Sequence, residues 1–170
     1  MQTTTNPTTT TTSDPATNPT GTIFWFDSQV LEVLVSAQDT DGRLSILRHR
    51  LVPGYAPPVH VHEREDQTLN VLEGSMTAWL DPGGDAPTEV TLGAGDSVFL
   101  PRGVPHAFKI GDEGARILEI NTPGGFEHFH LDAGDEATHD GIPEQRPPDI
   151  ERMARCAADY GCTILGPPAG

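Results

Sequence analysis

The sequence predicts an all-β protein whose short strands form a sandwich or a barrel. Between Ile23 and Ile120, short apolar or alternating runs follow one another at close spacing, separated by Gly, Pro and Asp. Alternating runs favour strands with one buried face, and the residues between them favour tight turns. No stretch of this region has a convincing helical pattern, so strands alone are expected to form the core.

Each predicted strand is bounded by such turn residues. The strands are Ile23–Phe26, Val30–Val35, Leu44–Val52, Val59–His62, Thr68–Leu72, Ser75–Leu80, Val90–Leu92, Val98–Leu100, His106–Ile110 and Ile117–Ile120. Glu73 and Gly74 separate two of them and are interpreted as the turn of a hairpin. On its second strand Met76 shares one face with Ala78 and Leu80.

The two ends of the chain have a different composition. Residues 1–21 are rich in Thr, with Pro and Asn and almost nothing apolar, which predicts a disordered tail or a partner-binding arm. Residues 22–146 form the predicted barrel. Residues 147–170 are predicted to pack on it as a helix, capped by Asp149 and ended by Gly161, followed by a strand from Cys162 to Leu165.

Charge and cysteine content narrow the function classes. Asp and Glu total 25 against 10 Lys and Arg, giving a formal charge of −15. Such a surface repels nucleic acid and anionic membranes, so neither is an expected partner. No signal-peptide pattern or membrane-spanning apolar run is present, and a cytoplasmic location is expected. Cys156 and Cys162 are the only cysteines and are interpreted as apolar fillers.

The chain has seven histidines, and their spacing gives the main evidence for a metal site. His60 and His62 lie two residues apart on a predicted strand, so both imidazoles project to one face and can offer nitrogen ligands to one metal. His128 and His130 repeat this spacing but are interpreted as a half-exposed pair on a loop or edge strand. The two other isolated residues, His49 and His139, are interpreted as surface residues. The short acidic run Glu63–Asp66 is read as a solvated turn.

The surroundings of these histidines resemble the two motifs of the cupin superfamily. The first motif is matched by Gly54, His60, His62 and Gly74, and the second by Gly95, Pro101, Gly103 and His106. Thr122–Glu127 and Tyr160–Pro168 look like the matching segments of small quercetinase-like cupins. The resemblance implies a cupin jelly-roll barrel, commonly a homodimer, with a metal held by His60, His62 and His106.

The fourth ligand of the family, a glutamate, is missing here. Counting forward from His62 with the shorter gap that the motif allows places it at Asp66, and counting back from Gly74 places it at Gln67. Strand alternation favours Gln67, since it would face inward with Leu69 and Val71. A neutral amide cannot take up a proton at neutral pH, so Gln67 would orient substrate or water. The metal itself stays open among Fe, Ni, Cu, Mn and Zn.

The resulting hypothesis is a metal-dependent dioxygenase acting on an aromatic or polyketide-like small molecule. Phe108, Ile110 and Met76 are the predicted substrate-contacting residues, Ile110 standing where the second motif has Asn. Glu73 is an alternative base. Two further readings stay open: a metal-poor pocket that promotes cyclisation, isomerisation or dehydration, and a pocket that binds a small ligand without turnover.

Overall fold

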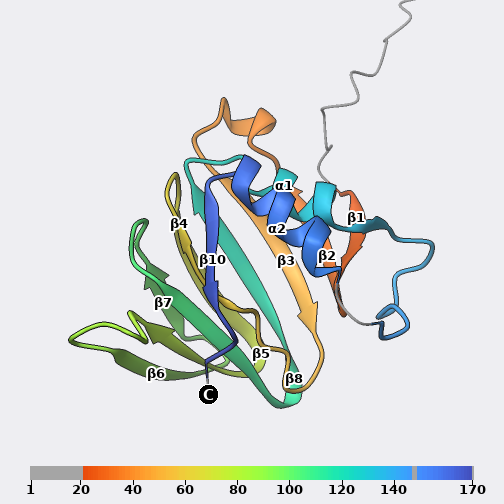
Figure 1. The fold of residues 1–170 in the computed structure, drawn as a ribbon. Coiled ribbons are helices and arrows are strands. Elements are labelled where there is room, and N and C mark those ends of the chain that lie inside the picture. Colours follow the sequence, from red (N-terminus) through yellow and green to blue (C-terminus); the bar gives the residue numbers. More distant parts are fainter. Residues whose placement is uncertain (1–20, 147–148, 170) are drawn as a thin grey trace, which may run out of the picture.

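The computed structural model describes residues 21–146 and 149–169, so the predicted tail lies almost wholly outside the described residues. The strands are β1 (Ile23–Phe26), β2 (Gln29–Val35), β3 (Ser45–Leu51), β4 (Val59–His62), β5 (Asp66–Leu80), β6 (Thr88–Gly93), β7 (Ser97–Leu100), β8 (His106–Thr122), β9 (Asp135–Glu136) and β10 (Cys162–Gly166). The helices are a short 3-10 turn (Gln38–Thr40), α1 (Glu127–Ala133) and α2 (Ile150–Asp159). The prediction of an all-β barrel with a C-terminal helix is confirmed (Figure 1).

Two long antiparallel strands, β5 and β8, form the frame of the barrel. Their pairing runs from Asp66 opposite Thr122 to Leu80 opposite His106. The second half of β8 also pairs with β3, and β5 pairs with β7 at one end and with β6 at the other. Because both strands bend, each contributes to two walls, and His106 is brought beside His60 of β4.

The predicted hairpin at Glu73 and Gly74 was wrong, because the chain continues as one strand. The register between β5 and β8 shifts on either side of Gly74, so this point is a bulge rather than a reversal. Gly74 has φ of +78°, and a Cβ there would lie 2.0 Å from the carbonyl oxygen of Gly114 on β8. Glycine permits the bend at this close crossing.

Two hydrophobic cores fill the fold. The first lies between the barrel walls and contains Leu69, Met76, Leu100 and Ile110. The second packs β1, β2 and β3 against the helices, with Phe26, Phe126 and Phe129 among its members. Figure 1 shows α1 and α2 side by side against this end of the molecule.

The C-terminal segment follows its prediction closely. The Asp149 side chain accepts a hydrogen bond from the backbone N–H of Arg152, as expected of a helix N-cap. After Gly161, β10 pairs antiparallel with β4, placing Cys162 opposite His62. The end of the chain therefore closes the wall that carries the first two motif histidines.

Helix α1 was not predicted. Glu127 is fully buried; its carboxylate accepts hydrogen bonds from the backbone N–H groups of Ala37 and Gly125 at 2.7 and 2.8 Å. The contact with Ala37, 90 residues away, ties the segment to the rest of the fold, and no local sequence pattern indicates it. Among the described residues, no helix is both long and apolar enough to cross a membrane.

Candidate metal centre and its cavity

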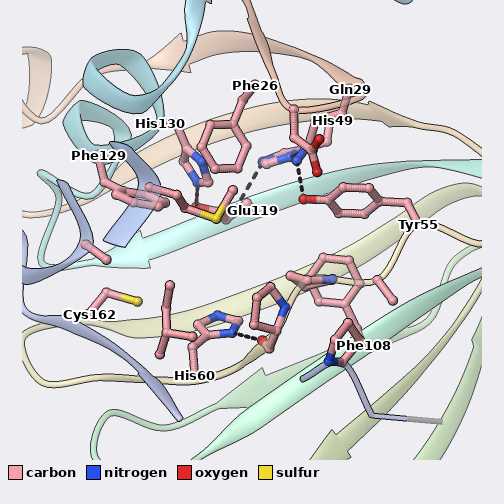
Figure 2. A pocket seen from close by; sticks show the side chains of 18 of the residues that line it. Phe26, Gln29, His49, Tyr55, His60, Phe108, Glu119, Phe129, His130 and Cys162 are labelled. Atoms are coloured by element: carbon pink, nitrogen blue, oxygen red, sulfur yellow. Dashed lines mark hydrogen bonds and ion pairs between the residues drawn. The ribbon is translucent and has the colours of Figure 1, made fainter. Parts of the chain in front are cut away.

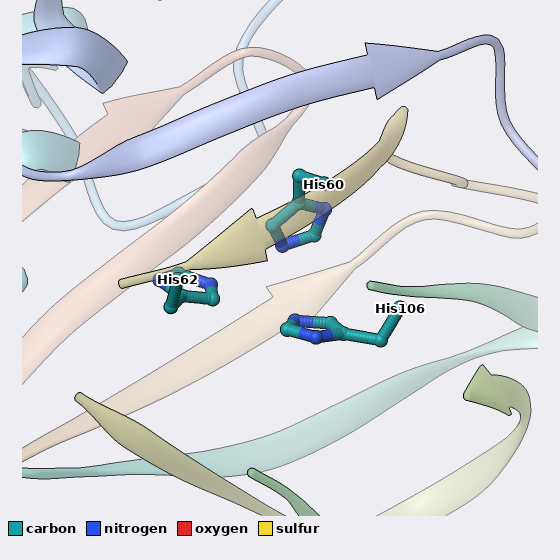
Figure 3. Close-up of side chains that lie close together, drawn as sticks. All are labelled: His60, His62 and His106. Carbon is teal, nitrogen blue, oxygen red and sulfur yellow. The ribbon is translucent and has the colours of Figure 1, made fainter. Parts of the chain in front are cut away.

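The three predicted histidines meet at one point of the barrel. His60 and His62 project from β4 and His106 from the start of β8 (Figure 3). Their ring centroids lie 4.5 to 5.2 Å apart, and one nitrogen from each ring lies within 4.8 Å of the others. Two distant stretches of chain therefore bring three imidazoles together, as the motif spacing predicts.

Hydrogen bonds at Nδ1 fix the tautomer of two of these rings, and with it the nitrogen that can bind a metal. His60 Nδ1 lies 2.8 Å from the carbonyl oxygen of Pro58, and His106 Nδ1 lies 3.0 Å from that of Val104. A carbonyl oxygen can only accept, so Nδ1 of each ring carries the proton. In the neutral ring the lone pair is then on Nε2, which is the nitrogen available to a metal.

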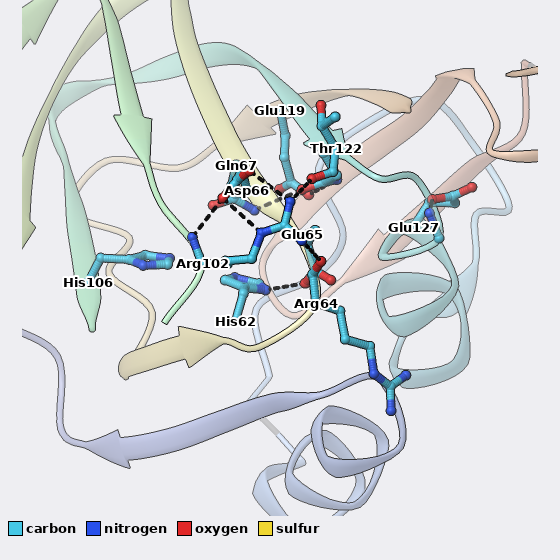
Figure 4. Close-up of polar contacts among 12 residues, drawn as sticks. His62, Arg64, Glu65, Asp66, Gln67, Arg102, His106, Glu119, Thr122 and Glu127 are labelled. Atoms are coloured by element: carbon cyan, nitrogen blue, oxygen red, sulfur yellow. Dashed lines mark hydrogen bonds and ion pairs between the residues drawn. The ribbon is translucent and has the colours of Figure 1, made fainter. Parts of the chain in front are cut away.

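His62 is oriented by a carboxylate rather than a carbonyl. Its Nδ1 lies 2.5 Å from Oε1 of Glu65, and both side chains are buried (Figure 4). Within the described residues, the buried Nε2 atoms of His62 and His106 have no hydrogen-bond partner. Buried polar atoms of this kind are costly unless a ligand meets them, so the group fits a metal ion.

Burial also keeps the rings in the ligating form. It lowers the pKa of His106 to about 4, with a further contribution from His62. Burial likewise holds the pKa of His60 well below its ordinary value, with His106 and His62 adding to the effect. A metal ligand must be deprotonated, and these imidazoles are neutral at physiological pH before any metal arrives.

The structure separates the two residues considered for the fourth position. Gln67 is buried, lines the cavity, and donates from Nε2 to Oδ1 of Asn121 at 3.3 Å. Asp66 instead pairs with the exposed guanidinium of Arg102, Oδ2 to Nη2 at 2.8 Å (Figure 4). Arg102 holds the pKa of Asp66 down at about 2. Strand alternation predicts this inward and outward placement.

A cavity of about 300 Å³ opens beside the centre. His60, Phe108, Tyr55 and Phe129 line it (Figure 2), together with Phe126, whose ring stacks on Phe129 and packs edge-on against His62. A partly open cavity with mainly apolar walls and a small set of polar side chains is typical of small-molecule sites.

The other two predicted substrate contacts lie elsewhere. Met76 and Ile110 are 1% and 2% exposed, pair with each other across β5 and β8, and pack in the first core. Neither side chain is among the described residues that line the cavity. Glu73, the alternative base, is exposed and paired with Arg116 at 2.9 Å, away from the cavity wall.

Sequence reasoning missed polar residues on the opposite wall. His49 and His130 are buried, not surface or half-exposed, and both lie about 3 Å from the Glu119 carboxylate, at 3.1 and 3.3 Å. Figure 2 shows the three across the cavity from His60. Strand alternation in β3 puts His49 on the same face as the buried Leu47 and Leu51, a signal that its flanking arginines obscured.

Comparison with known proteins agrees with this arrangement. Residues 47–121 match the family model of the cupin domain. A quercetin 2,3-dioxygenase of Bacillus subtilis (strain 168) is 27% identical over 107 residues, covering 63% of this chain and 30% of that protein. One from Aspergillus japonicus is 30% identical over 79 residues, covering 46% of this chain and 23% of that protein.

The fold has solved counterparts as well. The structure of KdgF from Halomonas sp. matches with a TM-score of 0.52 at 19% identity, covering 61% of this chain and 91% of that one. The barrel and the match over residues 47–121 show that this chain has the cupin fold. The matched region is similar to part of two quercetin 2,3-dioxygenases, and the match spans less than a third of the length of either curated relative.

Proposed function

We propose that this cupin is a metal-dependent dioxygenase acting on an aromatic or polyketide-like small molecule with an acidic hydroxyl. The observation that carries the proposal is the convergence of three imidazoles, with Nδ1 held outward, beside an aromatic cavity. Two relatives named as quercetin 2,3-dioxygenases support the reaction class. A small-molecule substrate is the expected partner, and a homodimer stays a prediction.

In this proposal His60, His62 and His106 would hold a divalent transition metal. Such an ion supplies Lewis acidity toward an oxygen of the substrate. The chain itself orients and encloses the substrate: Phe108 and Tyr55 offer ring faces at one end of the cavity, their centroids 6.3 Å apart. A cavity of about 300 Å³ suits a small planar molecule.

Gln67 has a defined part in the proposal. Its Nε2 is engaged with Asn121, so Oε1 is the atom left to meet a metal or a substrate hydroxyl. The amide cannot remove a proton, and the substrate would have to arrive ionised or meet another base. This separates the site from one built with the family's glutamate.

The first experiment measures metal content and oxygen uptake of the purified protein. We expect a bound transition metal, and oxygen consumption with a flavonol or a related polyphenol. His60→Ala should lose the oxygen uptake and the metal held by the three histidines, while His139→Ala, an exposed histidine, should keep both. Absence of metal, or full oxygen uptake after chelation, would contradict the proposal.

A second experiment tests position 67. Gln67→Glu would supply an anionic oxygen, so metal affinity should rise by about tenfold or more if this side chain reaches the ion. Gln67→Ala serves as the matched variant that removes the oxygen altogether. Equal affinity in all three proteins would show that position 67 is not a ligand.

The neutral Gln67 also favours one alternative, a cavity that folds a reactive intermediate for cyclisation, isomerisation or dehydration. An amide donor and acceptor in an apolar cavity can orient such a molecule without redox chemistry. Turnover of a polyketide-like compound under strictly anaerobic conditions would favour this reading over a dioxygenase. Tight binding without any product would instead indicate a ligand-binding protein.

A further inference from the structure

A second group of potential ligands faces the cavity, made of His49, Glu119 and His130. His49 comes from β3, Glu119 from β8 and His130 from α1, and their side chains are 4%, 6% and 8% exposed. One ligand atom from each lies within 4.8 Å of the others. Nothing in the proposed dioxygenase chemistry requires this group.

The tautomer of His49 is fixed by its hydrogen bond to Gln29, which Tyr55 in turn orients. Gln29 Nε2 donates to the hydroxyl of Tyr55 at 2.9 Å, which leaves Gln29 Oε1 as the acceptor for His49 Nδ1, also at 2.9 Å. Nδ1 therefore carries the proton of the neutral ring, and the lone pair is on Nε2.

That lone pair faces a carboxylate. His49 Nε2 lies 3.1 Å from Glu119 Oε2, yet among the described residues it has no partner in hydrogen-bond geometry. Two acceptors this close, buried and unaligned for a shared proton, call for a cation between them.

We propose that His49, Glu119 and His130 bind a second divalent transition-metal ion, distinct from the one expected at His60, His62 and His106. Two imidazoles and one carboxylate are an established ligand set for zinc and for non-haem iron. Ligand atoms about 2.0–2.2 Å from a common ion stand about 3.0–3.5 Å apart. His49 Nε2 lies 3.1 Å from one oxygen of Glu119, and His130 Nε2 lies 3.3 Å from the other.

Neighbouring side chains hold two of the three proposed ligands in place by hydrogen bonds. Asn121 Nδ2 donates to Glu119 Oε1 at 2.9 Å, and Gln29 holds His49. Burial lowers the pKa of His49, and although burial opposes ionisation of Glu119, the neighbouring His130 brings the pKa of that carboxyl well below its usual value. Both groups are thus in their ligating forms at neutral pH.

His130 is the weakest ligand of the three. Its Nε2 is 3.3 Å from Glu119 Oε1, but its buried Nδ1 has no hydrogen-bond partner in the described part of the chain. An outer-shell hydrogen bond typically contributes about 10–100-fold to metal affinity. The second ion should therefore exchange with chelators more readily than a comparable site with a complete outer shell.

The proposal is tested by titrating metal-free protein with Zn²⁺ and with Co²⁺ and counting bound ions. Wild type should bind two equivalents. The double variant His60→Ala, His106→Ala should keep only the ion at the second group. Glu119→Gln should keep only the ion at the three histidines. Glu73→Gln, which alters an exposed carboxylate on the other frame strand, β5, is the control and should bind both.

The decisive protein is the His60→Ala, His106→Ala double variant, because it reports on the second group alone. One equivalent, lost when His49→Gln is added, supports the proposal. No bound ion in the folded double variant overturns it, and the group then holds a proton instead. Since each group is removed separately, failure of the second site leaves the proposed dioxygenase centre standing, and the reverse also holds. Circular dichroism of each variant verifies folding.

Discussion

Glu65 holds His62 from behind the candidate metal centre. Its Oε1 lies 2.5 Å from His62 Nδ1, and the two side chains are 5% and 1% exposed. The other two histidines of the centre use backbone carbonyls for the same purpose, so His62 alone depends on a side chain. A carboxylate in this position fixes the ring and increases its basicity as a ligand.

Replacing Glu65 by Gln should weaken metal binding while preserving the fold. Loss of the carboxylate behind a ligating histidine typically costs about 10–100-fold in affinity. Competition with a chromophoric chelator would measure it. Glu63→Gln, two residues away and exposed, is the matched control and should bind as wild type does. If the two variants bind equally, Glu65 is not an outer-shell residue.

Stability of the metal-free protein should fall as the pH drops from about 7 to 4. His106 has its pKa lowered to about 4 by burial and by His62, whereas in the unfolded chain it is near 6.5. Between these values the unfolded state binds the proton and the folded state does not, so acid favours unfolding. His60, with its pKa lowered in the same way, adds to the effect.

The expected loss from His106 is about 3 kcal/mol between pH 7 and pH 4. Urea unfolding at a series of pH values would measure it. His106→Asn removes the titrating ring but keeps a polar side chain, and its stability should depend less steeply on pH. An unchanged slope in that variant would mean that His106 titrates normally in the folded protein.

Asp66 and Gln67 are adjacent but should respond differently to mutation. Asp66→Asn removes the carboxylate that receives the guanidinium and backbone N–H of Arg102, so the melting temperature should fall. Its metal affinity should stay as in wild type, because the side chain faces away from the cavity. Gln67→Ala should instead weaken metal binding, and its melting temperature should fall as well, because the buried Asn121 loses a hydrogen-bond donor. Equilibrium dialysis and thermal unfolding of the two variants decide this.

The barrel and the three-histidine group were predictable because both depend on local pattern. Side-chain alternation places His60 and His62 on the same face of one strand, and the motif spacing places His106 beside them, as the structure shows. The long strands β5 and β8 were not predictable in the same way. Gly74 reads as a turn in the sequence, and only the opposing carbonyl of Gly114 shows that it is a bulge.

The second histidine group escaped prediction for a related reason. His49 lies between two arginines and His130 on a segment without a clear period, so each reads as a surface residue. Their shared partner Glu119 is far from His49 in sequence and 11 residues from His130, on a different element. Only tertiary packing of α1 against β3 and β8 brings the three together, and a single sequence carries no local record of that contact.

The two cysteines should differ sharply in reactivity, as their surroundings differ. Cys162 is buried at the cavity wall, and burial raises the pKa of its thiol to about 12. Since the thiolate is the nucleophile, Cys162 should resist iodoacetamide at pH 8. Half-buried Cys156 on α2 should react first. Mass spectrometry of folded protein should find label at Cys156 only, and Cys156→Ser should remain unlabelled until denaturant is added. Rapid labelling of Cys162 in that variant would show that β10 opens in solution, exposing the wall against which His62 is placed.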